Sequence, residues 1–227
     1  MPTISIEKAK NHHVSMISYI SDFVQSGDAL KLSVSNGNVK MGAVASISLP
    51  AVITCRPGAA CASKCYALRM EMRRTNVAKV YARDLALWAT DPASYERQAI
   101  SAAYMQRFFR WHVSGDIVSC AYLDMMIRVA RTCTKTEFLC FTKRYELINS
   151  YLAEGHTLPE NLHVIFSAWP GEDLPNPHRL PVAAMVPKGS DPDPDWQQCG
   201  GNCTNCACRG CGCWALQAGQ TICFAEH

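Results

Sequence analysis

Residues 107–143, RFFRWHVSGDIVSCAYLDMMIRVARTCTKTEFLCFTK, contain one complete strand–helix–strand unit. A strand pattern opens the stretch and ends in the polar turn Ser114-Gly115-Asp116. An amphipathic helix pattern follows over 117–133, and a short buried strand pattern comes next over 137–143. A strand, a long helix and a second strand indicate a parallel βα unit.

The same alternation extends toward both ends of the chain. A helix over 144–155 and strands over 161–168 and 179–187 follow the unit, and helical patterns separated at Asp91-Pro92 precede it. A hairpin around Asn36-Gly37-Asn38 within 31–50 is also expected. The βα units are too few for an eight-stranded barrel. The predicted fold is therefore α/β, a partial, open TIM-like β/α barrel.

Composition limits the classes of protein. The chain has 227 residues, is 48% hydrophobic and 18% charged, and carries a net charge of +3, as expected of a globular protein without a basic nucleic-acid-binding stripe. No apolar run is long enough for a membrane helix, and the first residues lack a signal-peptide pattern. We expect a cytoplasmic protein. We expect two parts, a barrel over 1–187 and, after the linker KGSDPDPDW, a cysteine-rich tail over 188–227 that packs on it.

Thirteen cysteines in such a chain indicate reduced thiols or metal ligands rather than disulfides. Cys55, Cys61 and Cys65 form the pattern C-x5-C-x3-C in a loop directly after a strand. The loop has no C-x-x-C pair and no nearby histidine, so it suits an iron–sulfur cluster better than a structural zinc.

The tail offers more thiols than one tetrahedral zinc ion can use. Two C-x-x-C pairs within it are only two residues apart, which makes a zinc site built from them cramped. Two alternatives stay open: one 4Fe–4S cluster shared with the loop, or a second cluster in the tail. The candidate ligands are Cys199, Cys203, Cys206, Cys208, Cys211 and Cys213.

Polar residues at the ends of the predicted strands are further candidates, because parallel α/β folds gather their chemistry there. His112 is either a buried core histidine or a donor to a cluster sulfur. Asp116 either caps a helix that begins near Ile117 or contacts a ligand, and Lys143 is either solvated or placed near a cluster or an anion. Cys120, Cys133 and Cys140 are expected to be buried apolar residues.

Three segments, CASKCYA (61–67), FRWHVSGDIVSCAYLD (109–124) and CGCW…ICFAEH (211–227), resemble the phage gene-product-eighty-eight family. The resemblance runs from Asn38 to His227. That family in turn looks like shortened radical S-adenosylmethionine enzymes, which are partial barrels with a three-cysteine loop after the first strand. The resemblance implies that the loop cysteines hold a 4Fe–4S cluster with one open iron. It also implies that the turn Ser114-Gly115-Asp116 lies near the amino group of S-adenosylmethionine.

The expected function is 4Fe–4S cluster binding with a redox role, in a phage-encoded protein of the host cytoplasm that has an electron-transfer partner. One alternative is a radical S-adenosylmethionine enzyme of unknown substrate. The other is a zinc-stabilised module that binds a host protein.

Overall fold

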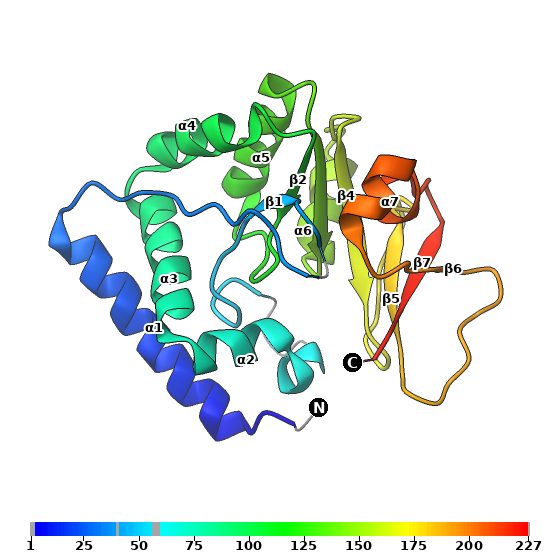
Figure 1. The fold of residues 1–227 in the computed structure, drawn as a ribbon, viewed down its shortest axis with the longest axis horizontal. Helices are drawn as coiled ribbons and strands as arrows, with labels where there is room; N and C mark the ends of the chain where they lie inside the picture. The colour runs from blue at the N-terminus through cyan, green and yellow to red at the C-terminus, as the bar shows by residue number, and fades with distance from the viewer. Residues whose placement is uncertain (1–2, 40, 56–59, 227) are drawn as a thin grey trace.

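The computed structural model describes residues 3–39, 41–55 and 60–226. Its centre is an open sheet of seven parallel strands in the order β1-β2-β3-β4-β5-β7-β6 (Figure 1). The α/β class is thereby confirmed, with a sheet that does not close. The strands are β1 (Ala45–Ile47), β2 (Phe108–Trp111), β3 (Glu137–Thr142), β4 (Leu162–Ala168), β5 (Val182–Val186), β6 (Gln197–Gln198) and β7 (Thr221–Ala225).

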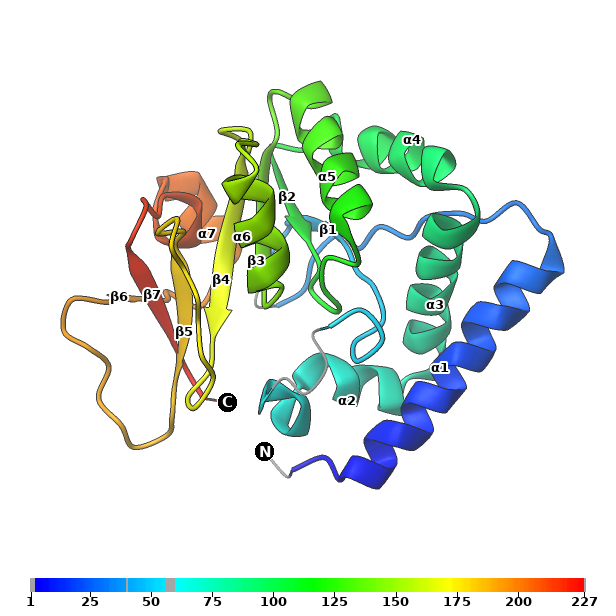
Figure 2. The same ribbon diagram turned by 180° about the vertical axis from the view of Figure 1, so that it is seen from behind.

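Most helices lie on one side of this sheet, and α7 lies on the other (Figures 1 and 2). Within the described ranges, none of the helices is both long and apolar enough to cross a membrane. The helices are α1 (Ile6–Ser26), α2 (Tyr66–Arg73), α3 (Thr75–Thr90), α4 (Pro92–Ala103), α5 (Cys120–Thr132), α6 (Tyr145–Ala153) and α7 (Cys203–Arg209), with 3-10 turns η1 (Ala60–Lys64) and η2 (Gly212–Trp214).

Both faces of the sheet are apolar, and different parts of the chain cover them. Phe138 and Cys140 of β3 point into the larger core, which α4, α5 and α6 cover. Leu139, between them, points to the second face and packs in a core with Trp214 and Leu216 of the tail. An open parallel sheet must bury both faces, and here the tail buries the second one. Residues 188–226 therefore complete the sheet and its second core.

Three expectations about local structure were wrong. The hairpin over 31–50 is reduced to two isolated antiparallel bridges, Ser35–Ser46 and Asn38–Gly42, and the only strand in this stretch among the described residues, β1, joins the sheet through parallel pairing with β2. The helix expected over 117–133 begins at Cys120, since the Ser119 hydroxyl accepts a hydrogen bond from the Tyr122 amide at 3.3 Å and caps it. The helical pattern before Asp91 is also two helices, α2 and α3, which meet at Arg74.

Candidate functional site: two groups of thiols

The loops that follow β1 to β4 meet at the carboxyl edge of the sheet. The Asp116 amide donates to Thr54 Oγ1 at 3.0 Å, which joins the β2 turn to the loop after β1. The Lys143 amide donates to Asp116 Oδ2 at 2.8 Å, and Lys143 Nζ donates to Ser167 Oγ at 2.7 Å. In Figure 1, α2 and the C-terminus lie below the sheet at this same edge.

Asp116 ties the ends of β2 and β3 together. Its carboxylate is buried and accepts hydrogen bonds from Thr142 Oγ1 at 2.6 Å, the Ile117 amide at 2.7 Å and the Lys143 amide. Burial raises the pKa of this carboxyl, and the three donors oppose that shift. The side chain is therefore already engaged, and it does not cap α5, contrary to expectation.

The turn before Asp116 requires a glycine. Gly115 has φ +82°, and a Cβ there would lie 2.6 Å from Thr54 Oγ1 and 2.7 Å from the Leu49 carbonyl oxygen. The neighbouring Ser114 hydroxyl donates to Glu71 Oε1 of α2 at 2.7 Å. Ser114 and Gly115 thus fix the loop that carries the first cysteines against β2 and α2.

His112 belongs to the larger core. Its Nε2 lies 3.0 Å from the Tyr122 hydroxyl, which lies 2.7 Å from the Tyr95 hydroxyl. Burial, with a smaller effect of Arg110, lowers the pKa of His112 to about 3, so the ring is neutral. His112 is therefore a buried core histidine, held in a chain of hydrogen-bonded side chains.

The first group of thiols is Cys55, Cys61 and Cys65, which we call the loop thiols. All three are partly buried, and burial, Asp116 and the other two thiols raise the pKa of Cys55 to about 12. Burial also raises the pKa of Cys61 and of Cys65, whereas Lys143 lowers both. The loop thiols are therefore electrostatic neighbours, and Cys61 and Cys65 share the cation of Lys143.

Lys143 is nearly buried, with 8% of its surface exposed, so it is not the solvated lysine that was one expectation. Its Nζ lies 5.6 Å from the centre of the Trp169 ring, within cation–π distance. The carboxyl edge thus places one ammonium group beside the loop thiols.

The second group comprises four of the six candidate tail cysteines, which we call the tail thiols: Cys199, Cys203, Cys206 and Cys213. All four are partly buried against the second core. Burial raises the pKa of Cys213 to about 12, and the other three add to this shift. The pKa of Cys206 is raised by burial and then by Cys211, Cys199 and Cys203. The tail thiols therefore lie close together.

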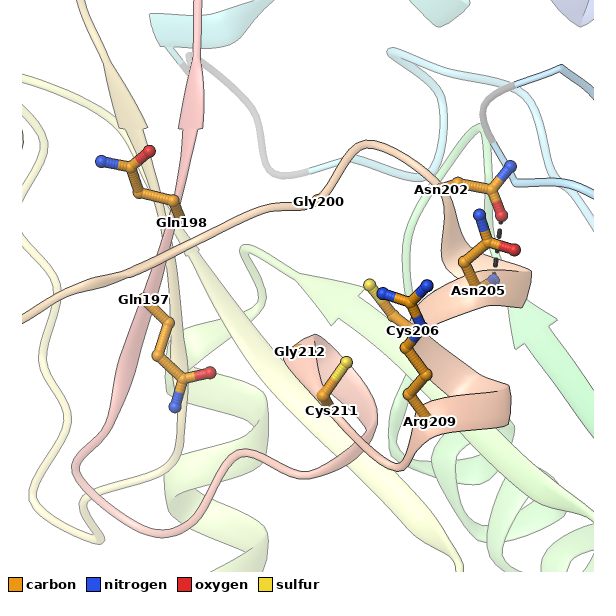
Figure 3. A pocket seen from close by; sticks show the side chains of 9 residues that line it. All are labelled: Gln197, Gln198, Gly200, Asn202, Asn205, Cys206, Arg209, Cys211 and Gly212. Carbon is orange, nitrogen blue, oxygen red and sulfur yellow. Dashed lines mark hydrogen bonds between the residues drawn. The ribbon is translucent and has the colours of Figure 1, made fainter.

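The remaining two tail cysteines, Cys208 and Cys211, are exposed. Cys211 and Cys206 both line a pocket of about 290 Å³ beside α7, together with Arg209 (Figure 3). Elsewhere in the chain, Cys133 and Cys140 are buried as expected, but Cys120 is exposed at the start of α5, contrary to expectation.

Glycine leaves room for one of the tail sulfurs. Gly212 has φ +62°, and a Cβ there would lie 3.3 Å from Cys206 Sγ and 3.4 Å from Cys206 Cβ. A Cβ at Gly200 would lie 3.7 Å from the same sulfur. The Cys199 sulfur also accepts from the Gly201 amide at 3.4 Å. The backbone thus approaches the tail thiols closely, as it does where glycines surround a bound group.

The thiols are neighbours, but they do not form a compact group around one point. Among the described residues, no three cysteine, histidine or acidic side chains converge as a single metal ion requires. Zinc with sulfurs at about 2.3 Å would hold the four sulfurs within roughly 4 Å of one another. A 4Fe–4S cube is a larger body than one metal ion and takes thiolates as its usual ligands, so these side chains are donors of the chemical kind that a cluster uses.

Sequence reasoning missed one residue of this region, Arg110. It faces the tail thiols from β2 and lowers the pKa of Cys203 and Cys213, which burial raises. The sequence did contain a signal for its position, because successive side chains of a strand point to opposite faces of the sheet. Phe109 and Trp111 point into the larger core, so Arg110 must point to the second face.

The Gene product 88 family model matches residues 23–222, which is most of the chain. The chain belongs to the Gene product 88 family. The resemblance to this phage family is thereby confirmed. No curated protein and no solved structure matches the chain. Membership in the Gene product 88 family does not by itself say which chemistry the thiols perform.

Proposed function

We propose that the protein binds iron–sulfur clusters and transfers electrons. The observation that carries the proposal is the group of four tail thiols, gathered on the second face of the sheet from β6–α7 and η2. Four thiols that are neighbours on one face of the sheet match the four thiolate ligands of a 4Fe–4S cube. A cube with four thiolate ligands has no open iron, which suits electron transfer.

The surroundings of the tail thiols also suit a cluster. Trp214, 8% exposed, packs with its ring centre 5.2 Å from that of Phe108 and helps to cover the second face. Such apolar cover limits the access of water, one of the factors that set the reduction potential of a cluster. The pocket beside Cys206 (Figure 3) is where a redox partner would approach the group most closely.

The loop thiols would hold a second cluster. They number three, so one iron would lack a protein thiolate. Lys143 would supply a positive charge beside this cluster and favour its more negative, reduced form.

Binding of S-adenosylmethionine at the open iron is the second candidate, favoured by the three-thiol loop at the carboxyl edge of the sheet. The turn Ser114-Gly115-Asp116 does not add to it. Ser114 donates to Glu71, and the Asp116 carboxylate already accepts three hydrogen bonds. In this proposal the turn orients the loop, and any contact to the amino group of the ligand must come from other groups.

Iron analysis of two serine variants tests the assignment. The wild-type protein purified without oxygen should contain about eight irons, for two cubes. Replacing all three loop cysteines should leave about four, and replacing Cys203 and Cys213 should also leave about four. Stoichiometric zinc in place of iron would support the zinc-stabilised module and refute the cluster proposal.

A further inference from the structure

The C-terminal end of α7 is a Schellman motif, the turn that commonly ends a helix at a glycine. Gly210 has a left-handed backbone, with φ +60°, and its amide donates to the Ala207 carbonyl oxygen at 3.1 Å. The Cys211 amide donates to the Cys206 carbonyl oxygen at 3.0 Å. These two hydrogen bonds define the motif, and the residues that the second one joins commonly have side chains in contact. Here both of those residues are cysteines.

The two cysteines meet the backbone requirement for a disulfide. The bond lengths on either side of the 3.0 Å hydrogen bond limit the separation of the Cys206 and Cys211 Cα atoms to about 7 Å. Disulfides usually join Cα atoms about 4.4–6.8 Å apart. The Cys206 sulfur also lies beside the residue that follows Cys211, since a Cβ on Gly212 would lie 3.3 Å from it. The two thiols can therefore join with little movement of the backbone.

The pair is accessible from outside the protein. Cys211 is exposed, Cys206 is partly exposed, and both line the pocket shown in Figure 3. Arg209, Asn202 and Asn205 line the same pocket, so its wall presents a positive charge and amide groups. A few polar groups of this kind orient a small ligand in a pocket. The wall suits a small peptide-like disulfide with anionic carboxylates, such as oxidised glutathione.

We propose that Cys206 and Cys211 are a redox-active dithiol that undergoes thiol–disulfide exchange with a low-molecular-weight, peptide-like disulfide. The exposed Cys211 thiolate attacks one sulfur of the external disulfide, the S–S bond breaks, and one thiol leaves with the proton that Cys211 lost. The Cys206 thiolate then attacks the Cys211 sulfur of the mixed disulfide and releases the second thiol, again with a proton. In total the two cysteines lose two electrons and two protons, and the external disulfide gains them.

The exchange needs no bound metal, but it has a consequence for the proposed function. Cys206 is one of the four tail thiols, and a sulfur held in a disulfide is no longer the thiolate that binds a metal. The tail therefore accepts a cluster only when the pair is reduced. This consequence rests on the proposed function, whereas the exchange itself is measured without metal.

Reaction of the full-length, metal-free protein with oxidised glutathione tests the exchange. After the remaining free thiols are blocked with iodoacetamide, trypsin cuts after Arg209 and separates the two cysteines. A disulfide between Cys206 and Cys211 then joins the peptides 189–209 and 210–227, and fragmentation in the mass spectrometer identifies the linked residues. We expect this link to be the main disulfide of the tail.

Cys206→Ser and Cys208→Ser are a matched pair of variants, because both residues lie on α7 and side chains two positions apart on a helix do not face each other. Cys206→Ser should lose the link and accumulate Cys211 as a mixed disulfide with glutathione, since the second thiol is missing. Cys208→Ser should form the link as fast as the wild-type protein. Circular dichroism of each variant checks that the fold is retained.

The proposal is overturned if oxidised glutathione leaves both thiols free, or if Cys211 stays in a mixed disulfide in the wild-type protein. It is also overturned if Cys208→Ser prevents the link. Failure of the iron–sulfur proposal looks different. In that case the protein purified without oxygen contains no iron, while the link between Cys206 and Cys211 still forms on oxidation.

Discussion

Gly212→Ala tests directly whether Cys206 is a ligand. Gly212 and Gly210 have nearly the same left-handed backbone, with φ of +62° and +60°, on either side of Cys211. Alanine at either position costs about 1–2 kcal/mol of unfolding free energy through backbone strain. Only at Gly212 would the new Cβ crowd Cys206, at 3.3 Å from Sγ and 3.4 Å from Cβ, because nothing lies within 4 Å at Gly210.

The two variants should therefore lose similar stability but differ in iron content. Urea unfolding of the metal-free proteins measures the loss of unfolding free energy that the two variants share. Iron analysis after anaerobic purification measures the difference, and we expect Gly212→Ala to fall from about eight irons toward about four while Gly210→Ala keeps its iron. Equal iron in both variants would show that the position of the Cys206 sulfur does not matter, and the tail assignment would fail.

Three further changes have defined outcomes. His112 has a pKa of about 3 in the folded protein, below the ordinary value of 6.5, so its stabilising effect is complete above pH 6.5 and is lost as the pH falls toward 3. Urea unfolding should show that His112→Asn removes about 2 kcal/mol of the stability difference between pH 7.5 and pH 5, and an unchanged difference would contradict the neutral ring. Cys208→Ser should keep the full iron content, because Cys208 is exposed and is not one of the tail thiols, whereas Cys203→Ser should lose the iron of the tail. The opposite result in iron analysis would reassign the ligands. Gly115→Ala should lower the free energy of unfolding by about 3 kcal/mol, because of backbone strain and overlap of the new Cβ with Thr54 and Leu49. Gly155→Ala, where the Cβ has no atom within 4 Å, should lower it by about 1–2 kcal/mol. Similar urea midpoints for the two variants would be inconsistent with the packed turn.

The alternation of strands and helices was predictable because each element is encoded locally. The strand and helix patterns of 107–143 match β2, α5 and β3 within a few residues. The meeting of the Asp116, Lys143 and Ser167 regions also follows from parallel pairing, which brings the carboxyl ends of β2, β3 and β4 to one edge.

The tail could not be predicted in the same way. Cysteine is compatible with helix, turn and strand, so the density of cysteines over 199–213 hid α7 and η2, and β7 was also missed. The choice of four thiols from six depends on which side of α7 packs on the sheet. Cys203 and Cys206 lie toward the second core, whereas Cys208 is exposed two residues later.

The surroundings of Arg110 could not be predicted from the sequence either. A charged residue in the middle of a strand can face solvent, a partner or a ligand, and its sequence neighbours do not say which. Only the return of the tail across the second face places Cys203 and Cys213 against this side chain.

The most direct measurement is the metal content and absorption spectrum of the protein purified without oxygen, before and after addition of dithionite. Cluster binding predicts a brown protein with about eight irons and a matching amount of sulfide, with absorption around 400 nm that bleaches on reduction. A colourless protein that contains stoichiometric zinc and does not respond to dithionite would contradict the account.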